Sequence, residues 1–214
     1  MSLSETRRDS LALAIANSGI SERTAYFLPL MRLLTDGAPV SGEQLAAAIN
    51  RPVAEVTEAL RQFEEIVYDE EGRIVGAGLS LLPTPYHFEI NGHLLYTWCA
   101  LDTLLFPLWL GSPAQVSSTC PVTGQPIHLR VSPERLEYFD PGSLVLSLLI
   151  QEELATCCNI RDAFCAYSQF FASRQAASAW QVSHPDGHLL PIEEAFTLGR
   201  TLARLTMQRL QEER

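Results

Sequence analysis

A cysteine and an aspartate stand three positions apart in the stretch YTWCALDTLLFP. On a helix, residues at this spacing share a face, so the Cys99 thiol and the Asp102 carboxyl can reach one ligand. A carboxyl buried among apolar residues needs a partner or a proton, and its pKa rises toward values that suit proton transfer. The pair is therefore a candidate for ligand binding combined with acid–base chemistry.

A purely structural role explains the same two residues. Asp102 would then cap a helix that begins at Thr103, and Cys99 would be a small buried hydrophobic residue. Taken alone, the pair favours this structural interpretation.

The other cysteines lie in three places. Cys165 belongs to the aromatic-rich stretch FCAYSQFFAS, where a single cysteine usually serves packing. Cys157 and Cys158 are adjacent, which suits joint chelation of one ion poorly. Cys120 lies in SSTCPVTGQPIHL, which is similar to half of a zinc ribbon, but structural zinc needs four ligands and no CxxC pair occurs. Three histidines are available to complete a ligand set, but their spacing matches no known metal site: His87, His93 and His128.

The composition is that of a globular protein. The chain has 214 residues, of which 47% are hydrophobic and 19% charged, so it can bury a substantial core. Its net charge of −10 disfavours nucleic-acid phosphates and acidic membranes as partners. A small neutral or cationic ligand is compatible with this charge.

Five cysteines, an odd number, and no convincing secretory signal argue against a disulfide framework. The apolar run Leu104–Leu110 is far shorter than a membrane span, and Pro107 interrupts it. We therefore expect a cytoplasmic protein with reduced thiols and no membrane partner.

The first part of the chain has the pattern of a winged helix. Apolar residues at helical spacing predict a helix over Thr24–Thr35, which Gly37 ends. Ser41 begins a second, capped helix, and Pro52 opens a third. Two β-prone runs then flank an acidic turn at Glu71–Gly72, as in a hairpin.

Winged helices often bind DNA, but the charge of this one argues against it. From Ser41 to Ile66 the chain has five acidic and two basic residues, a net charge of −3. Few side chains are thus available for phosphates or base edges. We predict a structural module without a nucleic-acid partner.

The remainder alternates between strand-like and helical stretches. Strands are predicted over YHFEI, AQVSS and IHLRVS. A buried strand or a short helix is predicted over SLVLSLLI, and a strand with aromatic ends over FCAYSQFFAS. The tail from Pro191 to Arg214 predicts a helix. We expect an α+β fold: a winged-helix-like three-helix bundle with a hairpin over residues 1–82, then a mixed domain of antiparallel strands and helices over residues 83–214.

Several of these motifs together resemble one family. YTWCALDTLLFP, VSSTCPVTG and FCAYSQFFAS, in this order, are similar to the alkylmercury lyases, also called organomercurial lyases. The resemblance extends over FLPLMRLLTDGAPVSGEQLAAAINRPVAEV, YDEEGRIVGAGLSL and the tail stretch IEEAFTLGRTLARL, from about residue 24 to about residue 205. Each motif alone is weak, and their joint order and spacing make the resemblance specific.

The resemblance implies an active site formed by Cys99, Asp102 and Cys165, with Cys120 as a further family cysteine of structural role. One position departs from the family pattern: Ala166 follows Cys165, where many members carry a second cysteine. The spacing of four residues between Cys165 and FFAS matches the family motif and assigns the catalytic position to Cys165.

The implied activity is protonolysis of the carbon–mercury bond of R–Hg⁺, giving a hydrocarbon and Hg(II), as part of mercury detoxification. Mercury is soft and binds thiolates, here those of Cys99 and Cys165, and Asp102 would exchange the proton. Mercury is thus substrate and product, and no cofactor is expected. External thiols are needed for turnover, and cytosolic thiols or mercuric reductase would accept Hg(II).

Two other functions remain open from the sequence. One is a winged-helix regulator that senses a metal through cysteines. The other is a homologue that binds Hg(II) without cleaving carbon–mercury bonds.

Overall fold

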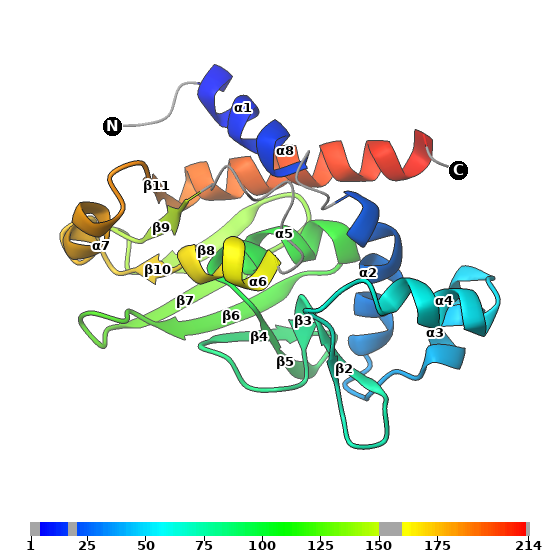
Figure 1. Ribbon diagram of the computed structural model, residues 1–214. Coiled ribbons are helices and arrows are strands. Elements are labelled where there is room, and N and C mark those ends of the chain that lie inside the picture. Colours follow the sequence, from blue (N-terminus) through cyan, green and yellow to red (C-terminus); the bar gives the residue numbers. More distant parts are fainter. Residues whose placement is uncertain (1–4, 17–20, 150–159, 213–214) are drawn as a thin grey trace.

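The computed structural model describes residues 5–16, 21–149 and 160–212 (Figure 1). Helices and antiparallel strands are mixed along the chain, which confirms the expected α+β class. One hydrophobic core runs through the described part of the molecule, from Ala12 in the first helix to Ala203 in the last.

Four helices open the chain: α1 (Glu5–Ile15), α2 (Ser21–Leu34), α3 (Gly42–Ile49) and α4 (Val53–Leu60). Helix α3 begins where predicted, because Gln44 N–H donates to Ser41 Oγ while the Gln44 side chain accepts from Ser41 N–H. Asn50 ends this helix in the left-handed region, at φ 54°. The predicted series of three helices is present in α2, α3 and α4.

The predicted hairpin follows as β1 (Val67–Tyr68) and β2 (Ile74–Ala77). In its turn the Asp69 carboxylate accepts hydrogen bonds from Glu71 N–H and Arg73 N–H. The helices and this hairpin together form the winged-helix-like N-terminal module.

The hairpin is part of a larger sheet. The other strands are β3 (Leu79–Ser80), β4 (Tyr86–Ile90), β5 (His93–Thr97), β6 (Ala114–Thr119), β7 (Pro126–Val131) and β8 (Leu136–Asp140). Their order is β1-β2-β3-β5-β4-β6-β7-β8, with antiparallel neighbours throughout. Pairing of Leu79 with Thr97 and of Ser80 with Tyr96 joins the hairpin side of the sheet to the rest.

Two helices lie in layers over this sheet. Helix α5 (Ala100–Leu110) packs against strands β4, β5 and β7, and α8 (Ile192–Glu212) packs against α5. Figure 1 shows α8 as the long C-terminal helix, with α1 lying across it. The Trp109 indole N–H donates to Thr206 Oγ1 at 3.1 Å, so a buried polar contact joins α5 to α8.

A second sheet has the order β10-β9-β11, formed by β10 (Phe170–Phe171), β9 (Val145–Leu148) and β11 (His188–Pro191). Between β9 and β10 lies α6 (Ile160–Ala163), and α7 (Ser178–Ser183) precedes β11. The stretch SLVLSLLI thus contains a strand, one of the two predicted alternatives.

The predicted strand over FCAYSQFFAS is wrong for most of its length. Residues Cys165–Tyr167 form a 3₁₀ turn, and only Phe170 and Phe171 pair as a strand. The turn forms because Tyr167 N–H and Ser168 N–H donate to the carbonyls of Phe164 and Cys165, three residues back in each case.

Candidate active site

Cys99 lies at the junction between strand β5 and helix α5. It is the N-cap of α5, with extended backbone angles of φ −146° and ψ 171°. Asp102 occupies the third helical position, and its Oδ2 accepts the Cys99 N–H at 3.1 Å. The helix therefore begins at Ala100, and the prediction that Asp102 caps a helix starting at Thr103 is wrong. This capping arrangement holds the Asp102 carboxylate beside Cys99.

Cys165 reaches the same place from a distant part of the chain. Its turn is joined to the start of α5 by Ser168, which is fully buried. The first two helical N–H groups, those of Ala100 and Leu101, donate to Ser168 O and Ser168 Oγ, each at 3.1 Å. Tyr86 Oη also donates to Ser168 O, at 3.3 Å. Ser168 thus connects the segment that carries Cys165 to the one that carries Cys99 and Asp102.

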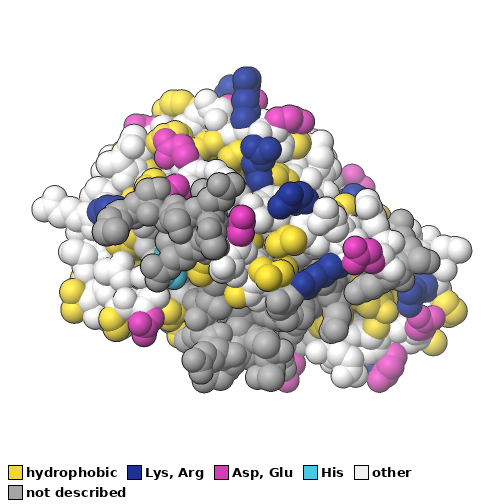
Figure 2. Space-filling model, turned by 90° about the horizontal axis from the view of Figure 1, so that it is seen from above, with side chains coloured by type: hydrophobic (Ala, Val, Ile, Leu, Met, Phe, Trp, Pro, Cys, Tyr) yellow, Lys and Arg dark blue, Asp and Glu magenta, His cyan; other side chains and the backbone are white. Residues whose placement is uncertain are grey.

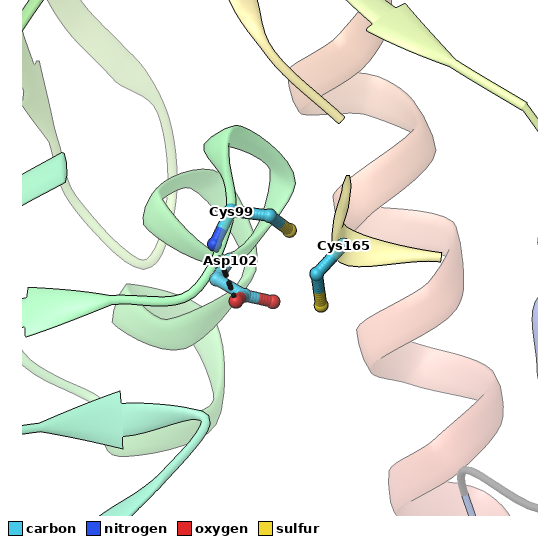
Figure 3. A group of neighbouring side chains, drawn as sticks. All are labelled: Cys99, Asp102 and Cys165. Atoms are coloured by element: carbon cyan, nitrogen blue, oxygen red, sulfur yellow. Dashed lines mark hydrogen bonds between the residues drawn. The ribbon is translucent and has the colours of Figure 1, made fainter. Parts of the chain in front are cut away.

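The three predicted residues form one cluster. The sulfurs of Cys99 and Cys165 and a carboxylate oxygen of Asp102 all lie within 4.8 Å of one another. Figure 3 shows both thiols and the carboxylate directed toward a shared space between α5 and the Cys165 turn. Both cysteines are free thiols and buried. Two soft sulfur ligands and one carboxylate suit a soft metal ion.

Burial raises the pKa of the Asp102 carboxyl to about 7, because it disfavours the charged form. Hydrogen bonds from the Cys99 side chain and from the Cys99 and Trp98 backbone lower that pKa, but burial outweighs them. The carboxyl can therefore both accept and donate a proton near neutral pH.

The pKa of the Cys165 thiol lies well above its ordinary value, first because of its hydrogen bond to Cys99 and then because of burial. The pKa of the Tyr86 hydroxyl is also raised, by burial and by the nearby Cys99, Asp102 and Cys165. Without a bound ligand, the Cys165 thiol thus keeps its proton.

Beside the cluster lies an apolar cavity of about 60 Å³. Cys165 and Asp102 form part of its wall, together with Trp98 and Phe106. Arg161 lies over the Trp98 ring, 5.7 Å from its centroid. The other lining residues come from five parts of the chain: Thr24, Phe27 and Met31 of α2; Ala77 and Gly78; Leu101, Leu105 and Trp109 of α5; Ile160 and Phe164; and Leu202 of α8.

Cys120 lies apart from this cluster. It is buried, with 1% exposed, at the end of β6. Burial raises the pKa of its thiol, but hydrogen bonds from Ala172 N–H, Thr123 and Val122 N–H outweigh this effect and leave the pKa lowered. In the described ranges, Cys99, Asp102 and Cys165 form the one group of three or more His, Cys, Asp and Glu side chains arranged to hold a metal. Cys157 and Cys158 lie outside the described residues.

Sequence reasoning missed Ser168 and the α2 side chains of the cavity. Ser168 lies within FCAYSQFFAS, and a serine in an aromatic run gives no signal of a tertiary hydrogen bond. Phe27 and Met31 lie at helical spacing within the predicted helix Thr24–Thr35, and this spacing does not reveal which space their side chains border.

Comparison with known proteins places these features in a family. The alkylmercury lyase model matches residues 79–204, and a model described as the helix-turn-helix domain of alkylmercury lyase matches residues 8–78. The chain is 45% identical to an alkylmercury lyase of Streptomyces lividans, over 85% of this chain and 83% of that protein. It is 43% identical to one of Staphylococcus epidermidis, over 82% of this chain and 80% of that protein.

A solved structure is similar over nearly the whole length. The crystal structure of the mercury-bound form of MerB2 superposes with a TM-score of 0.67 and 26% sequence identity, covering 94% of this chain and 97% of that one. The family models, the curated relatives and this fold agree with one another, and the chain belongs to the alkylmercury lyase family.

Proposed function

We propose that this protein is an organomercurial lyase that cleaves the carbon–mercury bond of R–Hg⁺ by protonolysis. The observation that carries the proposal is the convergence of two thiols and one carboxyl of raised pKa beside an apolar cavity. Family membership supports the same chemistry and favours an enzyme over a metal-sensing regulator.

The two cysteines hold the metal. Mercury binds thiolates in preference to oxygen ligands, and Cys99 and Cys165 offer two sulfurs to one ion. Each thiol loses its proton as it binds, and Asp102 is the adjacent base that accepts one of them. Coordination by two thiolates adds electron density to the metal and to the carbon bound to it, which becomes basic enough to accept a proton.

Asp102 then returns the proton to carbon. A carboxyl with a pKa of about 7 is protonated often enough to act as the acid and ionised often enough to act as the base. The whole reaction converts R–Hg–X and two Cys–SH groups into R–H, a Cys–S–Hg–S–Cys product, one proton and X⁻. One thiol proton reaches carbon, and the other leaves to solvent.

The proposal requires no organic cofactor, since the substrate brings the metal. It does require external thiols, because Hg(II) held by two sulfurs leaves by thiol exchange. We propose that cytosolic thiols or a mercuric reductase accept the ion and that the protein works in the cytoplasm. None of the helices in the described ranges is long and apolar enough to cross a membrane.

The decisive experiment measures methane released from methylmercury and benzene released from phenylmercury, with a thiol in excess. The wild type should release both hydrocarbons, each carrying a single deuterium when the reaction runs in deuterated water. A protein that binds R–Hg⁺ tightly and releases no hydrocarbon would be a mercury-binding homologue, and the proposal would fail.

Asp102→Asn tests the origin of the proton. The amide keeps the size of the side chain but cannot exchange a proton in this pH range, so release should fall by about 10²–10⁴-fold while Hg(II) binding persists. Asp36→Asn, which changes an exposed carboxyl in a turn, is the matched control. Near wild-type cleavage by Asp102→Asn would assign the proton to a thiol or to water.

The cysteine assignment has its own test. A structure of the protein loaded with Hg(II) should show one ion between Cys99 and Cys165. Cys157→Ser and Cys158→Ser should keep most activity, and Cys120→Ser should mainly lower stability. Mercury bound at Cys120 or at the Cys157–Cys158 pair, with the other two sulfurs empty, would contradict the assignment.

A further inference from the structure

A positive charge lies at the edge of the cluster. The Arg161 guanidinium carbon is 5.7 Å from the centroid of the Trp98 ring, and Trp98 lines the same cavity as Asp102 and Cys165. Arg161 belongs to α6, four residues before Cys165 in the chain. It is exposed, whereas the Trp98 ring beside it is buried. The guanidinium therefore lies on the solvent side of that ring.

The charge of Arg161 reaches the site. The hydrogen bond to Cys99 and burial raise the pKa of the Cys165 thiol, and Arg161 acts against them. This local positive charge contrasts with the whole molecule, whose net charge is −10. A guanidinium over an aromatic ring can at the same time donate hydrogen bonds to a carboxylate, because its N–H groups form a planar fork that matches the two oxygens.

The proposed reaction brings a thiol to the same place. With external thiols in excess, R–Hg⁺ arrives bound to a thiolate as R–Hg–SR′, since mercury prefers sulfur. One turnover then converts R–Hg–SR′ and two Cys–SH groups into R–H, Cys–S–Hg–S–Cys and R′SH, so the departing R′S⁻ takes the second thiol proton. The organic group R suits the apolar cavity, and the substituent R′ is left toward solvent, where Arg161 lies.

We propose that Arg161 recognises a carboxylate on the thiol that carries R–Hg⁺, so that it speeds the reaction of organomercurial adducts of carboxylate-bearing thiols over those of neutral or cationic thiols. This proposal rests on the proposed lyase function and names its substrate class. An exposed ion pair alone contributes little, but a carboxylate held by two N–H groups of one guanidinium is bound more strongly and in a fixed orientation. Cys99 and Cys165 bind the metal, and Arg161 selects the carrier.

The test uses phenylmercury adducts of three thiols with the same two-carbon chain and different charge: mercaptoacetate (anionic), mercaptoethanol (neutral) and cysteamine (cationic). Benzene release is measured in a single turnover with enzyme in excess, so that release of Hg(II) does not limit the rate. For each adduct the second-order rate constant of a variant is divided by that of the wild type. This ratio removes the intrinsic differences among the thiols.

Arg161→Gln should lower the rate constant for the mercaptoacetate adduct by about threefold to tenfold and change that for the mercaptoethanol adduct by less than about twofold. Arg161→Lys keeps the charge and loses the fork, so it should lower the mercaptoacetate rate by less than Arg161→Gln does. Arg161→Glu should lower it further and raise the rate for the cysteamine adduct. Because the three adducts are compared on one variant, a partial loss of folded protein cancels.

Arg130→Gln is the matched control. Arg130 is an exposed residue of β7 between the buried Leu129 and Val131, so it lies on the face of the sheet opposite to the core. Its replacement should leave the three ratios equal. If the wild type releases no benzene from any adduct, the lyase function itself is wrong. If the wild type releases benzene and Arg161→Gln slows all three adducts equally or none of them, the proposed recognition of a carboxylate is overturned.

Discussion

Ser168 is the residue on which the geometry of the site depends most directly. Its carbonyl and hydroxyl accept the first two N–H groups of α5, and its own N–H donates to Cys165 O. It therefore fixes the distance between the turn that carries Cys165 and the helix start that carries Cys99. Small displacements of reacting groups reduce rates strongly, even when binding is retained.

Ser168→Ala should act as a positioning defect. The variant loses the acceptor of Leu101 N–H, at a cost of about 1–3 kcal/mol in stability, and keeps the carbonyl contacts. We expect kcat to fall by about 10–100-fold while one Hg(II) still binds per chain. Ser80→Ala is the matched control, since Ser80 is also buried and its Oγ accepts Leu82 N–H. Equal kcat values for the two variants would show that Ser168 has only a structural role.

The raised pKa of Asp102 makes stability depend on pH. The pKa of this carboxyl is ~3.9 in the unfolded chain and about 7 in the folded protein, so the folded state binds the proton more tightly. This proton therefore adds to the free energy of unfolding. Its contribution is complete below the pKa of the unfolded chain and is lost as pH rises through about 7. Asp102→Asn removes this titration and should gain stability relative to the wild type between about pH 4 and pH 8. Urea unfolding of both proteins across this range measures the difference, and a constant difference would refute the assignment.

The site could be predicted only in part from its residues. Cys99 and Asp102 are close in sequence, so their spacing alone predicts that they meet. Cys165 is far along the chain, and only the joint order of three motifs placed it with them. Ser168 and Met31 contribute through tertiary contacts, for which their immediate neighbours in sequence carry no signal.

Helices and strands were predicted correctly where contacts between residues close in sequence determine them. Helix α3 was predicted because Ser41 and Gln44 form a capping box within four residues. The stretch around Cys165 was predicted wrongly because its aromatic residues suit a strand. Hydrogen bonds to Ser147, whose Oγ accepts Gln169 N–H and donates to Tyr167 O, hold it in a turn instead.

The structure also bears on the predicted absence of DNA binding. Both arginines between Ser41 and Ile66 form ion pairs with glutamates nearby in the chain, Arg51 with Glu55 at 2.6 Å and Arg61 with Glu58 at 2.9 Å. Each guanidinium thus has a carboxylate beside it that offsets its positive charge and weakens its attraction for phosphate. We predict no salt-sensitive binding to duplex DNA at low micromolar protein, measured by gel shift at two salt concentrations. Binding that weakens steeply as salt rises would contradict this prediction.

The charge of the whole molecule is consistent with a small-molecule enzyme. Its net charge is −10, and on the face seen in Figure 2 the basic and acidic side chains are interspersed. No continuous basic surface is visible among the coloured side chains of that view. A cationic R–Hg⁺ species or its thiol adduct can approach such a surface more readily than a polyanion can.

In the whole molecule, the two parts of the chain that the family models match share one sheet and one hydrophobic core. Strand β2 of the first part pairs with β3 of the second, and β3 pairs with β5, so the large sheet continues from the hairpin into the strands that precede α5. The core cluster contains Met31 and Val56 of the first part together with Phe88 and Leu202 of the second. Unfolding either part alone would expose a sheet edge and the apolar wall of the cavity.

We therefore predict that the full chain unfolds in one cooperative transition. A differential scanning calorimetry trace should show a single peak whose calorimetric enthalpy equals its van't Hoff enthalpy. Binding of Hg(II) at the proposed site between Cys99 and Cys165 should shift the whole peak upward, because an ion that binds only the folded state stabilises every part that unfolds with the site. Hg(II) must be supplied at one equivalent, since excess ion would bind the cysteines of the unfolded chain and reverse the effect. Two resolved peaks, of which mercury shifts only one, would show that the helix-turn-helix region folds independently of the site, and helix α2 would then be a detachable cover of the cavity and not a fixed wall.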